Sequence, residues 1–170
     1  AEGFILMGCL VTVFNYISYH LLEAPFQLSQ SWIGLISIAY LAGIYSSSKA
    51  AQWSFKYGRA KVLPLMLLMM MAGLLITLIP ALWAILLGLI IFAFAFFAAH
   101  STASSWVSVQ AIQYRAVAAS LYLFCYYIGS SLLGSSGGLI WENFGWIGIN
   151  LSVVLVLAFG LILSIHLKAL

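Results

Sequence analysis

The segment FAFAFFAAHSTASSW (Phe92–Trp106) changes from apolar to polar without gaining a charge. It lies in an apolar run long enough to cross a lipid bilayer, so its polar groups are expected at membrane depth. Such groups are unfavourable there unless they face other helices or a water-filled cavity. The sequence therefore predicts that this helix forms one wall of a cavity. The polar side chains concerned are His100, Ser101, Thr102, Ser104 and Ser105.

The composition is that of an all-α integral membrane protein. Of the 170 residues, 65% are hydrophobic and only 5% are charged, whereas a soluble domain carries roughly a quarter charged residues. The net charge of +3 is too small and too dispersed to indicate a nucleic-acid partner. Cys9 and Cys125 lie in apolar runs, and their spacing predicts neither a disulfide framework nor a metal site. No cofactor is predicted, and the bilayer is the expected surroundings.

Six apolar segments reach the roughly 20 residues that a helix needs to cross a hydrocarbon core of about 30 Å. Residues that interrupt helices separate the segments: Pro25, Gly58, Pro80 and the stretch Glu142–Gly145. Pro64 is expected in the first turn of its helix, where a missing N–H has little effect. The six segments are about Phe4–Leu22, Trp32–Trp53, Val62–Ile79, Trp83–Val107, Val117–Trp141 and Trp146–Leu167.

The positive charges predict the orientation. With six spans, every Lys and Arg falls on one side of the membrane, and the opposite connections carry Glu23 and Glu142. Because cytoplasmic loops are enriched in Lys and Arg, both termini are predicted to be cytoplasmic. The positive residues are Lys49, Lys56, Arg59, Lys61, Arg115 and Lys168, and a belt of Trp32, Trp83, Trp141 and Trp146 is expected at the opposite interface.

The chain contains an internal similarity that predicts two inverted repeats. YLAGIYSSSKAAQWSFKYG (Tyr40–Gly58) aligns with YIGSSLLGSSGGLIWENFG (Tyr127–Gly145), and small residues fall on small residues. Each repeat would hold three helices, an odd number, so the second copy would be inverted, as in many transporters. The repeats would cover about residues 1–80 and 81–170. The alternative is a chance alignment of two Gly/Ser-rich helices.

Three helices carry polar faces that predict a shared binding cavity. The segments 62–79 and 146–167 have almost nothing polar to bury, so they are expected at the periphery, facing lipid. The other helices present polar and aromatic side chains at helical spacing, a combination suited to an organic molecule with a few polar groups. The predicted substrate-binding residues are Asn15, Tyr16, Tyr19, His100, Ser101, Ser104, Tyr122 and Tyr126.

Each of these residues also has a structural interpretation. Hydroxyls in membrane helices often bond their own backbone. His100 can contact substrate or carry a proton, or it can make a structural hydrogen bond. His20 beside Glu23 is either a gate or an interfacial residue. Ser130, Gly134 and Gly138, flanked by Gly129 and Gly137, predict a face for close helix packing.

The loop AAQWSFKYGRAK (Ala50–Lys61) resembles the second copy of the signature G-x-x-x-D-R-x-G-R-x-K of the major facilitator superfamily. Ala51 stands where the pattern has its leading Gly, and Phe55 where it has Asp. The lost Asp puts in doubt a salt-bridged gating role for this loop. The matching residues are Lys56, Gly58, Arg59 and Lys61.

The resemblance extends along essentially the whole chain. FNYISYHLLEAPFQLS (Phe14–Ser29), AAHSTASSWV (Ala98–Val107) and SLYLFCYYIGSSLLGSSGG (Ser120–Gly138) resemble the seventh to twelfth helices of bacterial inner-membrane efflux permeases of the drug and sugar type. The family implies two six-helix halves around a central cavity that work by alternating access, commonly as proton-coupled exporters. This chain would be the C-terminal half, and the missing N-terminal half would be its partner.

Two other function classes are alternatives to a transporter: an intramembrane enzyme and a non-transporting scaffold. A six-span intramembrane serine protease needs a Gly-x-Ser-Gly turn and a histidine deep in the sixth span. Ser101 and Ser104 lack those glycines, and His166 lies at the membrane edge, so no enzyme activity is predicted. A non-transporting scaffold would cover its polar faces with a second copy of the chain or another subunit. The absence of an initiator Met favours a piece of a longer protein.

Overall fold

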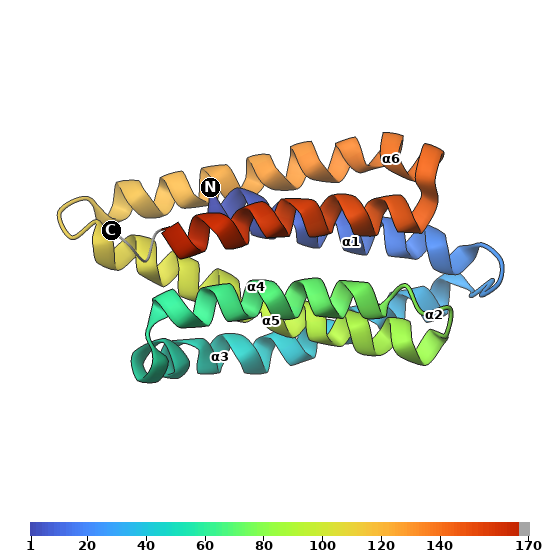
Figure 1. Cartoon of the computed structure of the whole chain (residues 1–170), viewed down its shortest axis with the longest axis horizontal. Helices are drawn as coiled ribbons and strands as arrows, with labels where there is room; N and C mark the ends of the chain where they lie inside the picture. The colour runs from blue at the N-terminus through green and yellow to red at the C-terminus, as the bar shows by residue number, and fades with distance from the viewer. Residues whose placement is uncertain (167–170) are drawn as a thin grey trace.

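A computed structural model describes residues 1–166 of the chain, and every regular element in that range is helical (Figure 1). Lys168 and the end of the predicted last span, Leu167, lie outside the described residues. Among the described helices, four are long and apolar enough to cross a membrane by length and composition, namely α1, α4, α5 and α6. The elements are α1 (Glu2–Leu22), α2 (Gln30–Leu35), the 3₁₀ turn η1 (Ile36–Ile38), α3 (Ala39–Tyr57), α4 (Arg59–Ile76), α5 (Leu82–Gln110) and α6 (Arg115–His166).

The prediction of one continuous helix over Trp32–Trp53 is wrong, because the 3₁₀ turn η1 separates α2 from α3 in this stretch. The interruption follows Gly34 and falls on Ile36-Ser37-Ile38. Glycine and β-branched residues are weaker helix formers than Ala or Leu, so this stretch tightens into a 3₁₀ turn. The helical path continues afterwards as α3, which ends where the Gly58 N–H donates to the Ser54 carbonyl oxygen.

The predicted turn Glu142–Gly145 is reduced to one residue. Helical structure runs on to Phe144, and the break inside α6 lies at Gly145, with φ 57° and ψ −149°. This conformation is essentially restricted to glycine. The two arms of α6, residues 115–144 and 146–166, lie side by side in opposite directions (orange and red in Figure 1).

Pro64 lies deeper in its helix than predicted. Because α4 begins at Arg59, three residues before the predicted start, Pro64 falls in its second turn. Proline has no N–H, so the carbonyl of Ala60 loses its usual helical partner. The early start reflects Gly58, whose φ of 85° lets α3 end and α4 begin with no further connecting residue.

Glycines set the closest approaches between helices. A side chain on Gly129 of α6 would overlap the Phe4 backbone of α1, and one on Gly8 would meet the Gly129 carbonyl oxygen. Gly73 of α4 and Gly88 of α5 face each other in the same reciprocal way. Small residues let membrane helices pack backbone to backbone, so the predicted packing role of the α6 glycines is confirmed.

The helices predicted to have almost nothing polar to bury in fact share a buried polar junction. Asn150 of the second arm of α6 is fully buried, and its amide donates to the Trp146 carbonyl oxygen. The indole of Trp146 donates to the carbonyl oxygen of Thr77, just beyond α4. The expectation failed because a single amide, Asn150, hardly changes the apolar character of a long run of residues. A buried amide nevertheless needs hydrogen-bond partners wherever it lies.

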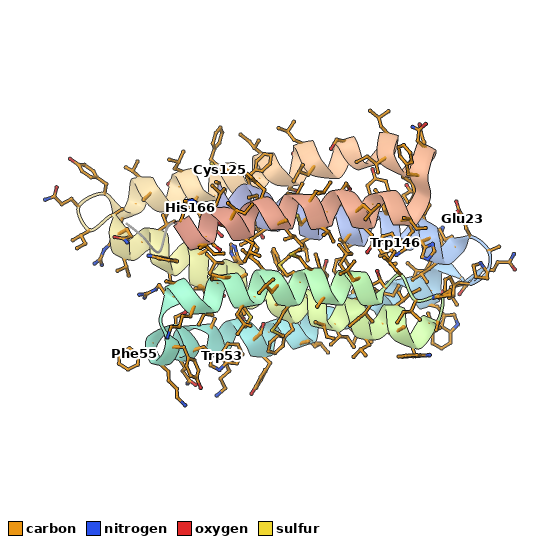
Figure 2. The ribbon with its side chains drawn as sticks, viewed as in Figure 1. Glu23, Trp53, Phe55, Cys125, Trp146 and His166 are labelled. Atoms are coloured by element: carbon orange, nitrogen blue, oxygen red, sulfur yellow. The ribbon has the colours of Figure 1, made fainter. Side chains whose placement is uncertain are left out.

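The two ends of the bundle differ in charge. The α3–α4 and α5–α6 connections lie at one end (Figure 1), so Lys56, Arg59 and Arg115 gather there. The α1–α2 connection and the Gly145 break lie at the other end, with Glu23 and Glu142. Figure 2 shows Glu23 and Trp146 at this second end and Phe55 and His166 toward the first.

Replacing Gly145 by Ala should destabilise the fold, whereas replacing Gly34 by Ala should not. An added Cβ meets nothing within 4 Å at either position, and only Gly145 has a positive φ. We expect Gly145→Ala to lower the free energy of unfolding by about 1–3 kcal/mol through backbone strain. Gly34→Ala, in a short helix, should be neutral or stabilising by up to about 1 kcal/mol.

Thermal unfolding of the two full-length variants in detergent, followed by circular dichroism, measures this difference. Equal melting temperatures for the two variants would show that the turn inside α6 does not need the conformational freedom of glycine.

Candidate functional site

His100 of α5 lies in a cluster of aromatic side chains at the contact with α6. Its Nδ1 atom and the Tyr122 hydroxyl are hydrogen-bonded at 3.0 Å. Its ring lies 4.9 Å from that of Tyr126 and stacks on Phe96 at 6.0 Å. The structure therefore brings together three predicted binding residues, and we call these four side chains the His100 cluster.

Two of the predicted serines of α5, Ser104 and Ser105, bond within their own helix. Ser104 donates to the Ser101 carbonyl oxygen at 3.2 Å, and Ser105 donates to that of Thr102 at 3.0 Å. Thr102 is buried and shares a hydrogen bond with Ser54 of α3 at 3.3 Å. These bonds are of the structural kind, although Ser101 and Ser104 remain half-exposed beside His100.

The three predicted residues of α1 line a hollow of about 550 Å³ between α1 and the first arm of α6. Asn15 and Tyr19 are exposed there, and Tyr16 is half-buried. We call this space the α1–α6 hollow. It is lined by Phe14, Asn15, Tyr16, Ser18, Tyr19, Gly138, Trp141 and Glu142.

The predicted binding residues thus fall into two groups, which aromatic contacts connect. Phe14 of the hollow stacks on Tyr40 of α3 at 4.7 Å, and Tyr40 meets Phe97 of α5 edge-on at 5.8 Å. Phe97 in turn packs edge-on against Phe96 of the His100 cluster at 5.1 Å. A continuous row of rings therefore runs from the hollow to His100.

The loop motif is tied to the polar segment of α5. The Arg59 Nε donates to the Ser105 hydroxyl at 3.3 Å. Gly58 supplies the turn, while Lys56 lies 5.1 Å over the ring of its neighbour Tyr57 and Lys61 is exposed. Through the bond between Arg59 and Ser105, this loop is therefore connected directly to the helix that carries His100.

Trp141 and Glu142 are site residues that sequence reasoning missed, because it assigned them to an interfacial belt and a connection. The helix continues through both of them. They follow Gly138 by three and four residues, which places them on the same helical face. That spacing is the signal that could have found them.

Glu2 is a third missed residue, buried inside the bundle. The neighbouring Gly3 packs on the ring and backbone of Tyr122, about 10 Å into α6 at 1.5 Å per residue. Glu2 is only 9% exposed, and neither carboxylate oxygen has a hydrogen-bond partner among the described residues. An acid, a phenol and an imidazole are therefore near neighbours where α1, α5 and α6 meet.

Ser104 and His166, the side chains considered for a serine protease, bond backbone carbonyls of their own helices. His166 lies at the exposed end of α6, where its Nδ1 bonds the Ile162 carbonyl at 2.9 Å. The hydroxyl of Ser104 is committed to its own helix. Within the described range, no group of three or more His, Cys, Asp or Glu side chains could hold a metal ion.

Comparison with known proteins finds relatives named as transporters. The chain is 49% identical to an uncharacterized transporter of Buchnera aphidicola from Schizaphis graminum, over 99% of the chain and 41% of that relative. It is 47% identical to the inner membrane transport protein YnfM of Escherichia coli (98% and 40%). It is 42% identical to the uncharacterized MFS-type transporter YybF of Bacillus subtilis (95% and 40%).

The chain therefore spans about 40% of the length of the curated relatives that it matches. No family model matches it, and no solved structure does.

Replacing Tyr122 by Phe should destabilise the protein more than replacing Tyr127 by Phe. The first variant leaves the His100 imidazole without its interhelical hydrogen bond, which is worth about 0.5–1 kcal/mol between membrane helices. Tyr127 is 64% exposed, so removing its hydroxyl breaks no bond between α5 and α6. Melting temperatures of the two variants in detergent provide the comparison. An equal loss of stability in the two variants would show that the hydrogen bond between His100 and Tyr122 does not stabilise the contact of α5 with α6.

Proposed function

We propose that this chain is the C-terminal half of a major facilitator superfamily transporter that moves a small organic solute by alternating access. The observation that carries the proposal is the alignment. Transporters of three bacterial species match 95–99% of the chain while the chain covers about 40% of each, as expected for one half of a two-part protein. The polar and aromatic side chains on helices of membrane length agree with it.

The proposed half crosses the membrane six times. Beside α1, α4 and α5, the two arms of α6 give two crossings, because Gly145 reverses the chain between them. The path through α2, η1 and α3 runs from Gln30 to Tyr57, which reaches about 40 Å at 1.5 Å per residue. This length suffices for the remaining crossing.

The packing supports two inverted repeats, about residues 1–80 and 81–170. The first helix of the first repeat, α1, packs mainly on α6, which holds the last two helices of the second repeat. The first helix of the second repeat, α5, packs mainly on α3 and α4, the last two of the first repeat. Exchanging the repeats therefore leaves the pattern of neighbours unchanged, as a pseudo-two-fold relation requires.

The similarity to an inner membrane transport protein supports a location in the bacterial inner membrane, and the charges support an orientation with both termini cytoplasmic. The end of the bundle that holds Lys56, Arg59 and Arg115 is the cytoplasmic end in this proposal, following the positive-inside rule. The opposite end, with Glu23 and Glu142, then faces the periplasm. The partner that completes the cavity is an N-terminal half, and the alternative arrangement is a second copy of this chain.

Proton-coupled efflux of drugs or sugars is the proposed mode of action. Its support is the resemblance to exporters together with two titratable side chains, His100 and Glu2, in the neighbourhood of Tyr122. His100 bonds the Tyr122 hydroxyl, and Glu2 lies beside the residue that packs on its ring. Ionisable groups buried in membrane bundles commonly mark ion or substrate pathways.

A transport assay of the full-length protein in proteoliposomes tests this function. The panel contains radiolabelled drugs and sugars, each measured with and without a pH gradient. We expect at least one solute to move, and to move faster with the gradient. Failure of every solute to move in protein that remains folded would contradict the proposal, and movement that ignores the gradient would remove the proton from it.

Replacing His100 by Ala in the full-length protein should reduce transport while leaving expression intact. The variant removes the imidazole from the contact between α5 and α6, at the end of the row of rings. His166→Ala is the matched control, because this histidine lies at an exposed helix end. The initial rate of transport per amount of folded protein is the measurement. Unchanged transport by the His100 variant would exclude this residue from the mechanism.

A further inference from the structure

The turn between α3 and α4 carries three positive charges and no negative one. Lys56 precedes the last residue of α3, Arg59 begins α4, and Lys61 lies in the first turn of α4. Only Gly58 separates the two helices, so the three cations are held close together. Like charges repel one another, and this turn therefore favours a neighbour that brings negative charge.

The chain itself offers no carboxylate to balance this turn. Residues 24–141 contain neither Asp nor Glu. Glu23 and Glu142 belong to the opposite end of the bundle, and Glu2 is buried inside it. A balancing charge for the α3–α4 turn must therefore come from outside this chain.

The three cations have different surroundings. The Arg59 Nε donates to the Ser105 hydroxyl at 3.3 Å, which directs this guanidinium toward α5. The Lys56 Nζ lies 5.1 Å over the ring of Tyr57, and an ammonium group with three donors can still donate to a second acceptor there. Lys61 is exposed. The two lysines are therefore the groups available to an external anion.

Aromatic side chains lie beside these lysines. Phe55 is 96% exposed and Tyr57 is 53% exposed. Figure 2 shows the Phe55 ring projecting away from the end of α3. Lysines next to exposed aromatic rings are typical of protein surfaces that lie at the boundary between lipid headgroups and acyl chains. At position 55 the family pattern has an Asp, which could pair with the cations, whereas this chain has a ring that suits the membrane.

We propose that the α3–α4 turn binds an anionic phospholipid. Lys56 and Lys61 contact the phosphate of the headgroup, and Phe55 and Tyr57 pack against the glycerol and the first carbons of the acyl chains. Membrane surfaces that contain anionic lipids attract Lys and Arg side chains close to them. The bound lipid holds the turn at the membrane surface, and the bond of Arg59 to α5 extends this restraint to the helix that carries His100.

The site is distinct from the cavity of the proposed transporter. It lies at the end of the bundle opposite the α1–α6 hollow, whose lining includes Glu142 (Figure 1). The inference uses the proposed orientation, in which the end with Lys56 and Arg59 faces the cytoplasm, where anionic lipids make the membrane surface negative. It goes beyond the proposed transport function because it assigns a lipid to a surface that takes no part in solute binding.

Native mass spectrometry of the full-length protein in detergent measures lipid binding directly. Phosphatidylglycerol and phosphatidylcholine with the same acyl chains are added in separate titrations, and the lipid-bound fraction gives each dissociation constant. We expect phosphatidylglycerol to bind at least about fivefold more tightly, because only this lipid has a net charge for the lysines to attract. Glycerophosphoglycerol, the headgroup without acyl chains, should compete weakly, because it leaves Phe55 and Tyr57 without a contact.

The variants test charge, position and ring separately. Lys56→Gln and Lys61→Gln should each weaken the binding of phosphatidylglycerol by about fivefold. Arg115→Gln is the matched control, because it removes the same charge at the same end of the bundle from the α5–α6 connection, which lies apart from this turn (Figure 1). Its binding should be unchanged. Phe55→Leu should bind like the unmodified protein, whereas Phe55→Asp should weaken binding by about fivefold or more. Melting temperatures confirm that each variant is folded.

Three results would overturn the inference: equal affinity for the two lipids, unchanged binding by both lysine variants, or an equal loss in Arg115→Gln. The last result would show a general attraction to this end of the bundle and no defined site. Failure to bind phosphatidylglycerol at all would show that another part of the full-length protein balances the turn, and would contradict the inference too. Each outcome is independent of the transport assay, because binding in detergent requires no solute to move.

Discussion

The approach of helix backbones at glycines is the constraint on which the rest of this bundle depends. Between helices in lipid the hydrophobic effect provides no attraction, because acyl chains are as apolar as leucine. Dispersion contacts and interhelical hydrogen bonds remain, and both fall off steeply with distance. Gly8 against Gly129 and Gly73 against Gly88 bring two pairs of helices close enough for these contacts to form. The glycines therefore act because they have no side chain to keep the helices apart.

The positions of the functional side chains follow from these approaches. Because α1 and the first arm of α6 touch backbone to backbone, Tyr16 reaches the Gly134 carbonyl and lies beside Trp141. On α5, Phe97 lies over Gly43 of α3, which brings its ring to Tyr40. The hollow and the row of rings are thus consequences of where the chain has no side chain. The side chains of the hollow and of the row of rings are therefore positioned mainly by the packing of their helices.

The sequence alone was enough for the long apolar helices and the packing role of the α6 glycines, because each depends on periodicity or composition. It was not enough where one residue decides the structure. The break at Gly145 depends on a single pair of backbone angles, and the pattern Glu142–Gly145 suggested a longer connection. Trp141 and Glu142 have interpretations as interface residues that composition cannot separate from binding. Asn150 was overlooked because partners for a buried amide are visible only in three dimensions.

The exposed residues of the bundle divide into two environments. On α4 and the second arm of α6, away from the helix ends with Lys61 and His166, they are aliphatic or Phe side chains, such as Leu65, Leu155 and Phe159, which acyl chains can contact without loss. On α1 and the first arm of α6 they include the amide of Asn15 and the phenol of Tyr19. Hydrocarbon offers no hydrogen-bond partner to an amide or a phenol. A bundle that met lipid on every side would therefore leave these groups unsatisfied, so the face that carries the hollow fits a neighbour that brings water or polar groups.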